Sequence, residues 1–344
     1  MIFKSPVDLV FGNMFIELHD VLPKTPIYLK LEGLSVTGSI KIKSAIRMVA
    51  RLELEGKLKS GMKVIESSSG NLGLALSMVC AAKGYPFTCV SDPNISPQTA
   101  RLIEAYGTKL IIVQNRDKNG GFLGSRIDLI HSMLAENSDL IWINQYENIN
   151  NVEAHYMTTG PEILEKFPVP DYVFVGAGTT GTLGGVSRYL RQHSPATKII
   201  AVDSVGSVTF GFPSGKRHIP GLGTSRPPEI RHYSSFDEIL MVDEEDTLRM
   251  CHRFARKGIL LGGSSGTVIC GIDQFADHIL PDACVVAISP DMGDRYVDTV
   301  YNLDWINSRY PDFYSQNSIS KNPAAPSVSG CHQLESLNVS EAIL

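Results

Sequence analysis

The chain has 344 residues, a formal charge of −5 and a hydrophobic content of 43%. This length is enough for one large or two modest cores, and the acidic balance excludes a broad basic surface for nucleic acid. No apolar run approaches the roughly 20 residues that span a bilayer, and no signal peptide is expected. The histidines include no His-Glu-x-x-His, so no metal site is expected. We therefore expect a soluble cytoplasmic protein.

Short β-rich segments alternate with longer segments of helical spacing. The first strand-like segment is Ile27–Leu31, and helical spacing is clearest in Leu72–Lys83, Pro97–Tyr106 and Leu183–Gln192. Further strands are predicted at Lys63–Ile65, Phe87–Val90, Leu110–Val113, Leu140–Ile143, Tyr172–Val175, Ile199–Val202, Ile239–Val242 and Val285–Ile288. This alternation is typical of parallel sheets covered by helices on both faces.

So many strands exceed the needs of one small sheet, and we predict an α/β protein with two doubly wound domains. An Asn-rich turn near Asn148–Asn151 interrupts the alternation and is a candidate boundary. Residues 204–228 hold many glycines and prolines without a clear period, which predicts a long ordered loop or lid. Residues 312–344 are rich in Ser, Asn and Pro and are predicted to form a flexible tail.

Two segments in the first half of the chain are candidates for chemistry. Lys41 lies just past the strand-like Ile27–Leu31, although a single lysine is most often a solvated side chain. Residues Glu66–Gly73 (ESSSGNLG) lie between a predicted strand and a predicted helix. Their hydroxyls, amide and free N–H groups suit a carboxylate at a helix N-terminus. A serine cap followed by a glycine turn explains the same residues without a ligand.

Two glycine-rich segments follow in the second half. Gly176–Thr182 (GAGTTGT) comes after an apolar strand and opens a helix, a geometry that holds a phosphate. The segment also fits Gly-x-Gly-x-x-Gly, and Asp203 ends the next strand, as in dinucleotide-binding proteins. These residues alone leave a monophosphate and a dinucleotide equally open, and a tight turn that binds no ligand is a less favoured third alternative. Gly262–Thr267 (GGSSGT), taken alone, is only a loop.

Together, these segments resemble the fold-type II pyridoxal-phosphate enzymes of the cysteine synthase and cystathionine β-synthase family. Lys41 and the three loops occur in the order and rough spacing of that family, and the resemblance extends from about Phe11 to Tyr296. It includes Gln145, the stretch TGPEI at 159–163 and the stretch PDMGDRY at 290–296. Around the lysine, the family's Asn-Pro-x-Gly-Ser-x-Lys-Asp-Arg is replaced by SVTGSIKIK at 35–43, which argues against cysteine synthesis.

The resemblance implies a role for each matching residue. Lys41 would bind the aldehyde of pyridoxal 5'-phosphate and act as the catalytic base, Asn71 would face the ring hydroxyl, and Ser264 would meet the pyridine nitrogen. The phosphate would lie among Gly178, Thr179, Thr180, Gly181 and Thr182. The substrate carboxylate would lie on Ser68, Ser69, Gly70, Asn71 and Gln145.

The resemblance also implies how the chain is divided and assembled. Residues 42–148 would form a smaller, mobile substrate-binding domain, and residues 1–41 with 149–311 a larger cofactor-binding domain. The cofactor would lie in the cleft between them. A homodimer acting on small amino-acid substrates is implied.

Within the family, the chain resembles the branch that joins O-phospho-L-serine to L-glutamate. That β-replacement gives N-(2-amino-2-carboxyethyl)-L-glutamate and phosphate through an aminoacrylate, a step towards 2,3-diaminopropionate and siderophores. The suggestive stretches are Glu66–Gly73, Trp142–Tyr146 and Pro220–Glu229. Glutamate has two carboxylates, so its site should contain a cation, for which Arg226 is the candidate. Tyr156 could line the same mouth.

Three alternatives remain open at this level. A cysteine synthase, or an O-phosphoserine or O-acetylserine sulfhydrylase, would use sulfide as the nucleophile in the same chemistry. An NAD-dependent dehydrogenase would explain Gly176–Gly181 and Asp203 but leaves Lys41 without a role. A relative without catalytic activity could act as a binding partner.

Overall fold

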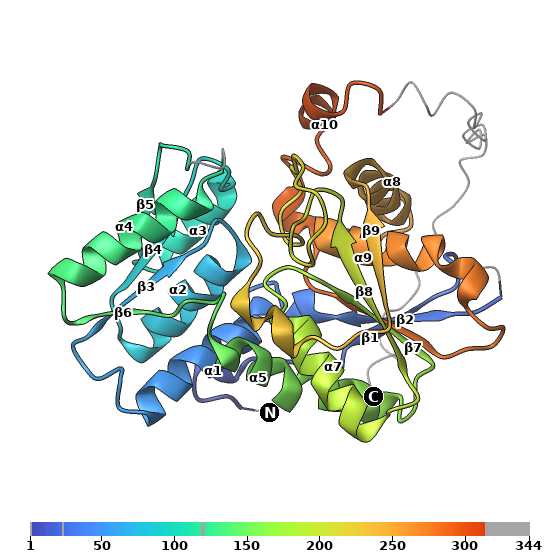
Figure 1. The fold of residues 1–344 in the computed structure, drawn as a ribbon, viewed down its shortest axis with the longest axis horizontal. Helices are drawn as coiled ribbons and strands as arrows, with labels where there is room; N and C mark the ends of the chain where they lie inside the picture. Colours follow the sequence, from blue (N-terminus) through green and yellow to red (C-terminus); the bar gives the residue numbers. More distant parts are fainter. Residues whose placement is uncertain (1, 23, 118–120, 314–344) are drawn as a thin grey trace, which may run out of the picture.

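The computed structural model describes residues 2–22, 24–117 and 121–313, and these form two β-sheets with helices packed against them (Figure 1). One sheet is parallel throughout, with the strand order β5-β4-β3-β6. Its strands are β3 (Lys63–Ser67), β4 (Phe87–Ser91), β5 (Lys109–Ile112) and β6 (Leu140–Trp142).

The second sheet has six strands in the order β1-β2-β10-β7-β8-β9. They are β1 (Phe15–Leu18), β2 (Ile27–Leu31), β7 (Tyr172–Gly176), β8 (Lys198–Ser204), β9 (Glu238–Val242) and β10 (Val285–Ser289). All neighbours pair in parallel except the edge strand β1, which is antiparallel to β2. Every residue of β10 is buried, as expected for a strand covered on both faces.

Helices surround both sheets and connect them. The α-helices are α1 (Lys41–Leu54), α2 (Asn71–Lys83), α3 (Pro97–Ala105), α4 (Leu123–Glu136), α5 (Ile149–Met157), α6 (Thr159–Lys166), α7 (Gly181–His193), α8 (Glu244–Ala255), α9 (Gly263–Gln274) and α10 (Leu303–Arg309). Short 3-10 helices span Pro6–Asp8, Glu32–Leu34, Glu229–Tyr233, Ala276–His278 and Gly293–Tyr296. Helix α1 contacts both α2 and α5, and α5 contacts α7, so these helices link the two halves (Figure 1).

The structure confirms the predicted α/β class and each predicted strand, with small differences at the ends. Strand β1 was not predicted, because four residues at a sheet edge give too short a pattern to recognise. The Asn-rich segment is the start of a helix, since the Asn148 side chain accepts a hydrogen bond from Asn150 N and caps α5. Residues 205–228 contain no helix or strand.

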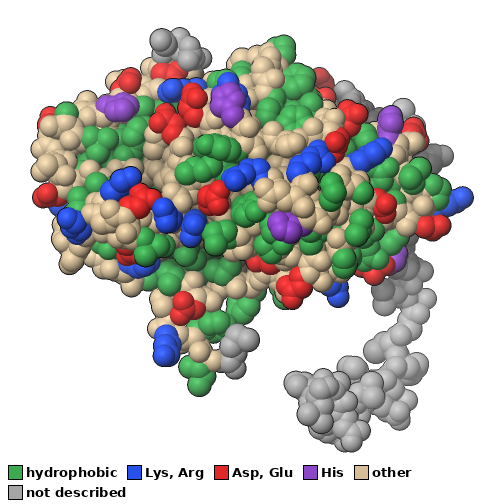
Figure 2. All heavy atoms as spheres, turned by 60° about the horizontal axis from the view of Figure 1, so that its bottom comes forward, with side chains coloured by type: hydrophobic (Ala, Val, Ile, Leu, Met, Phe, Trp, Pro, Cys, Tyr) green, Lys and Arg blue, Asp and Glu red, His purple; other side chains and the backbone are tan. Residues whose placement is uncertain are grey.

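The predicted domain limits at 42 and 148 stay a prediction. The predicted tail lies outside the described residues from 314 onwards. No described helix is long and apolar enough to cross a membrane. On the face drawn in Figure 2, basic and acidic side chains are intermixed with apolar ones.

The core around the six-stranded sheet offers a test of the fold. Phe174 on the central strand β7 is fully buried and packs edge-to-face against Phe275, with ring centroids 5.9 Å apart. Phe174→Ala should lower the free energy of unfolding by about 3–5 kcal/mol, because it removes buried area and leaves a cavity. Urea denaturation followed by circular dichroism measures this. Leu54→Ala, at a side chain that is 75% exposed, is the control, and equal effects of the two variants would contradict the assigned core.

Candidate active site

Lys41 is the first residue of α1 and lies next to the end of β10. Ile40 N donates to Pro290 O at 2.8 Å, and Ser39 forms a bridge with Asp291. Lys41 is half-buried, and among the described residues its amine has no hydrogen bond or ion pair. Burial lowers the pKa of Lys41, and the charge of Asp291 partly opposes this. A lowered pKa leaves more of the amine unprotonated, which is its nucleophilic form.

Asp291, which follows β10, accepts hydrogen bonds from three other elements. Asn71 Nδ2 donates to its Oδ2 at 2.8 Å, Ser264 Oγ donates to its Oδ1 at 2.7 Å, and the Tyr296 hydroxyl donates to Oδ2. Arg295 Nη1 donates to Asn71 Oδ1 at 2.7 Å. We call these five residues the Asp291 cluster. Burial raises the pKa of Asp291, and the donors oppose that effect.

The Asp291 cluster brings the starts of three helices together. Asn71 begins α2, Ser264 is the second residue of α9, and Asp291 lies beside the residues that lead into α1. None of these three helices has a side-chain hydrogen bond at its N-cap. Their first N–H groups and positive ends therefore point towards one region, which suits a polar or anionic ligand.

The serine loop at 67–70 presents hydroxyl groups at the start of α2. Ser68 Oγ accepts hydrogen bonds from Gly70 N at 3.3 Å and Gly73 N at 3.0 Å, so its own proton remains for another acceptor. Ser69 has no hydrogen bond through its side chain within the described part of the chain. Gln145 Nε2 donates to Ser67 O at 3.0 Å and holds this loop from the β6 side.

The glycine loop at 176–182 leads into α7. Thr180 has a positive φ of 69°, and its buried hydroxyl has no hydrogen-bond partner. Asn151 Nδ2 donates to Thr179 Oγ1 at 3.2 Å and to Gln145 O at 3.0 Å, so it ties this loop to the chain next to the serine loop. A Cβ on Gly181 would lie 2.2 Å from Asn151 Oδ1, which explains the glycine.

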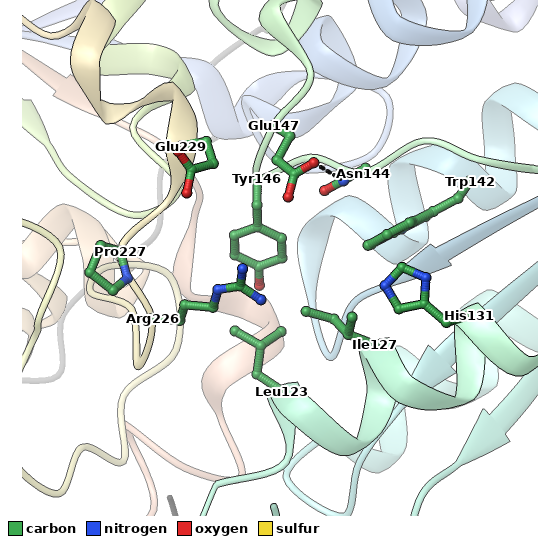
Figure 3. A pocket seen from close by; sticks show the side chains of 10 residues that line it. All are labelled: Leu123, Ile127, His131, Trp142, Asn144, Tyr146, Glu147, Arg226, Pro227 and Glu229. Atoms are coloured by element: carbon green, nitrogen blue, oxygen red, sulfur yellow. Dashed lines mark hydrogen bonds between the residues drawn. The ribbon is translucent and has the colours of Figure 1, made fainter.

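Two predicted substrate residues lie away from these loops. The Tyr156 hydroxyl donates to Gln192 Oε1 at 2.6 Å, in the last turn of α7, whereas the glycine loop is at its first turn. The structure therefore does not bring Tyr156 to the loops. Arg226 lines a cavity of about 120 Å³ beside Tyr146, the residue after Gln145 (Figure 3).

Comparisons with known proteins place this geometry in a family. The family model described as "Pyridoxal-phosphate dependent enzyme" matches residues 13–291. The chain belongs to the pyridoxal-phosphate-dependent enzyme family. It is 40% identical over 310 residues to the N-(2-amino-2-carboxyethyl)-L-glutamate synthase of Ralstonia nicotianae, covering 89% of this chain and 92% of the relative. The synthase of the same name from Cupriavidus metallidurans is 39% identical over 314 residues, with the same coverage.

A solved structure supports the same family. The crystal structure of O-ureido-L-serine synthase superposes with a TM-score of 0.80 at 31% sequence identity. The match covers 92% of this chain and 100% of that chain. The expected fold of the pyridoxal-phosphate-dependent family, with two α/β halves, is therefore confirmed.

The described residues fit the family's coenzyme. The orphaned Thr180 hydroxyl and the uncapped start of α7 form a cradle for a phosphate. A Cβ on Gly178 would lie 2.8 Å from Gly221 O, so the loop approaches another backbone closely. Lys41, at the start of α1, supplies an amine without a partner among the described residues, as an aldehyde-binding enzyme of this family requires.

The family match decides between the two interpretations of the glycine loop. It favours a monophosphate coenzyme over a dinucleotide and removes the basis for a dehydrogenase. Asp203, which supported the dinucleotide interpretation, is fully buried and accepts a hydrogen bond from Ser204 N at 2.8 Å. Burial raises its pKa to about 6, although the Ser207 hydroxyl opposes this.

Several residues that organise the site had no predicted role. Asp291, Arg295 and Tyr296 lie in the stretch 290–296, which is part of the resemblance, but no role was predicted for them. An acid directly after an apolar strand was the available signal. No sequence pattern indicated a role for Asn151 in the site, because its two hydrogen-bond partners lie in other loops.

The orphaned hydroxyl of Thr180 gives a prediction about coenzyme affinity. Thr180→Val keeps the shape and the β-branched backbone preference but removes one donor to an anion. The dissociation constant for pyridoxal phosphate should rise roughly tenfold to a hundredfold. Absorbance titration of the coenzyme-free enzyme measures it, and the melting temperature without coenzyme is the control. An unchanged dissociation constant would remove Thr180 from the phosphate site.

Proposed function

We propose that this enzyme replaces the phosphate of O-phospho-L-serine with the amino group of L-glutamate, giving N-(2-amino-2-carboxyethyl)-L-glutamate. The observation that carries this proposal is the identity of about 40% with two synthases named for that product, over about nine tenths of each chain. The free amine of Lys41 supports the same chemistry. The enzyme is thus a β-substituting transferase of small amino acids.

Bound pyridoxal phosphate supplies an electron sink that stabilises negative charge at Cα of the amino acid and allows the β-substituent to leave. We assign to Lys41 the bond to the coenzyme aldehyde and the transfer of the proton at Cα. Its lowered pKa favours its action as a base, because burial disfavours the ammonium form. Thr179, Thr180 and Thr182 would hold the phosphate, with Gly178 and Gly181 allowing its close approach.

The serine loop is assigned to the substrate carboxylate. Ser68 and Ser69 each retain a hydroxyl proton, and the uncapped start of α2 adds N–H groups. Gln145 supports the loop through Ser67 O. The electrostatic attraction of a helix N-terminus for an anion would orient the substrate so that Cα faces Lys41.

A buried cation supports phosphate as the leaving group. Arg126 on α4 is 8% exposed, and its Nε forms a 3.5 Å ion pair with Asp92 Oδ2 but makes no hydrogen bond. Burial raises the pKa of Tyr146, and the charge of Arg126 opposes this, so the two side chains are electrostatic neighbours. A guanidinium with unused donors is suited to a phosphate monoester and has no comparable use with an acetate ester.

The cavity at Arg226 is assigned to glutamate. Figure 3 shows the Arg226 guanidinium beside the Tyr146 ring, with Glu147 and Glu229 on the same side of the cavity. Among the described residues Arg226 has no ion pair. A free guanidinium can bind a carboxylate of glutamate, and the two acids can attract its ammonium group.

Product analysis tests the proposal directly. Purified enzyme with pyridoxal phosphate, O-phospho-L-serine and L-glutamate should release phosphate and form the expected adduct, detected by mass spectrometry. Parallel reactions with sulfide, and with O-acetyl-L-serine, measure the alternative nucleophile and leaving group. Faster turnover with sulfide would identify a sulfhydrylase instead. Borohydride reduction followed by peptide mapping should label Lys41.

Arg226 gives a prediction about substrate specificity. Arg226→Ala should raise the KM for L-glutamate roughly tenfold to a hundredfold and leave the KM for O-phospho-L-serine unchanged, because only one substrate loses its charged partner. Arg231→Ala is the matched control, since Arg231 lies in the same segment outside this cavity. Equal effects of both variants on glutamate would contradict the assignment.

We also infer a homodimer and a cytoplasmic location from the family resemblance. Analytical ultracentrifugation of the purified chain measures its oligomeric state.

A further inference from the structure

A cluster of charged residues is buried beside the active site, and the proposed chemistry does not use it. Lys30 Nζ lies 3.0 Å from Glu32 Oε1 and 2.8 Å from Glu162 Oε2. Lys43 Nζ contacts the same two carboxylates at 2.8 and 2.6 Å. Both lysines and Glu32 are almost completely buried. Buried charges are costly unless each is paired, and here every member has two partners.

A chain of hydrogen bonds runs from this cluster to the glycine loop. Lys43 Nζ donates to Thr159 Oγ1 at 3.3 Å, and Thr159 Oγ1 lies 3.0 Å from His155 Nδ1. His155 Nε2 lies 3.3 Å from Thr182 Oγ1 and 3.1 Å from Ser44 Oγ. His155 and Thr159 are completely buried, so water does not compete for these bonds.

The available acceptors favour one direction for this chain. A lysine ammonium can only donate, so Thr159 Oγ1 accepts from Lys43. Among the described residues, the Thr159 hydroxyl proton has no acceptor other than His155 Nδ1, so it donates there. A neutral imidazole that accepts at Nδ1 carries its proton on Nε2. That N–H then points at Thr182 Oγ1 and Ser44 Oγ. Thr182 therefore accepts from His155 and keeps its own proton for another acceptor.

The surroundings of His155 support the neutral ring. Burial lowers the pKa of His155 well below its usual value, and the charge of Lys43 lowers it further. No acidic side chain bonds to the ring, since its partners among the described residues are three hydroxyl groups. The imidazole thus has one donor and one acceptor, as the directed chain requires.

We propose that Lys43, Thr159 and His155 act as a hydrogen-bond relay that sets Thr182 as a donor to the coenzyme's phosphate. These are positioning residues, because only Thr182 would touch the phosphate. Each bond in the relay polarises the next, which strengthens the final donor. The proposal rests on the coenzyme site described under the proposed function. In this proposal, the buried lysine–glutamate cluster holds the charged Lys43 ammonium in place at the start of the relay.

The first test measures the proton on His155 in the wild-type chain. Nitrogen-15 NMR of the full protein, labelled at the imidazole rings, should show a neutral His155 with its proton on Nε2, both with and without pyridoxal phosphate. His155→Gln identifies the signal by its loss. A ring protonated on Nδ1, or on both nitrogens at neutral pH, would overturn the relay. The position of the proton on His155 can be measured in the coenzyme-free chain, so this result does not depend on the assigned coenzyme site.

The second test is a double-mutant cycle on coenzyme affinity. Thr159→Val should weaken pyridoxal phosphate binding about threefold to tenfold, the effect of one weakened hydrogen bond. In a Thr182→Val background, Thr159→Val should have no further effect, because the relay has lost its last member. Thr182→Ser, which retains the hydroxyl, should restore most of the affinity lost in Thr182→Val.

The adjacent Thr158 provides the matched control. Its hydroxyl donates to Ala154 O at 2.6 Å and takes no part in the relay, so Thr158→Val should leave the dissociation constant unchanged. Additive effects of Thr159→Val and Thr182→Val would overturn the proposal and indicate a purely structural role. A wild-type chain that binds no pyridoxal phosphate would instead overturn the proposed function.

Discussion

The buried carboxylate of Asp291 is the interaction on which the site depends. An isolated carboxylate is costly to bury, and here hydrogen bonds from Asn71, Ser264 and Tyr296 compensate it. These donors come from the starts of α2 and α9 and from the 3-10 helix after β10. One desolvated charge therefore fixes how loops from the two sheets meet beside Lys41.

The same carboxylate affects how Ser264 can meet the coenzyme. In this structure Ser264 Oγ donates its only proton to Asp291 Oδ1, so the oxygen offers lone pairs to any further partner. If Ser264 meets the pyridine nitrogen, as the resemblance implies, its electronic effect there would include the charge of Asp291, because buried hydrogen-bond networks couple their members.

Much of the fold followed from local patterns. The apolar runs of β7, β8 and β10 and the helical spacing of α2 and α7 are recognisable without tertiary information. Strand β1 and the cap at Asn148 were not recognised, because a short edge strand and an asparagine before a helix resemble ordinary turns. Lys41 and the serine and glycine loops were found only as a set, through their order along the chain.

The sequence by itself determined the family, the cofactor class and the three loops, because these depend on residue types at fixed local spacing. Only the tertiary structure decided which distant side chains share a proton or a charge. It brought Asn71 to Asp291, Asn151 to Thr179 and His155 to Thr182, and it directed Tyr156 towards Gln192 instead of the loops. Such pairs join residues far apart in the chain, and their geometry is set by helix and sheet packing that no local pattern encodes.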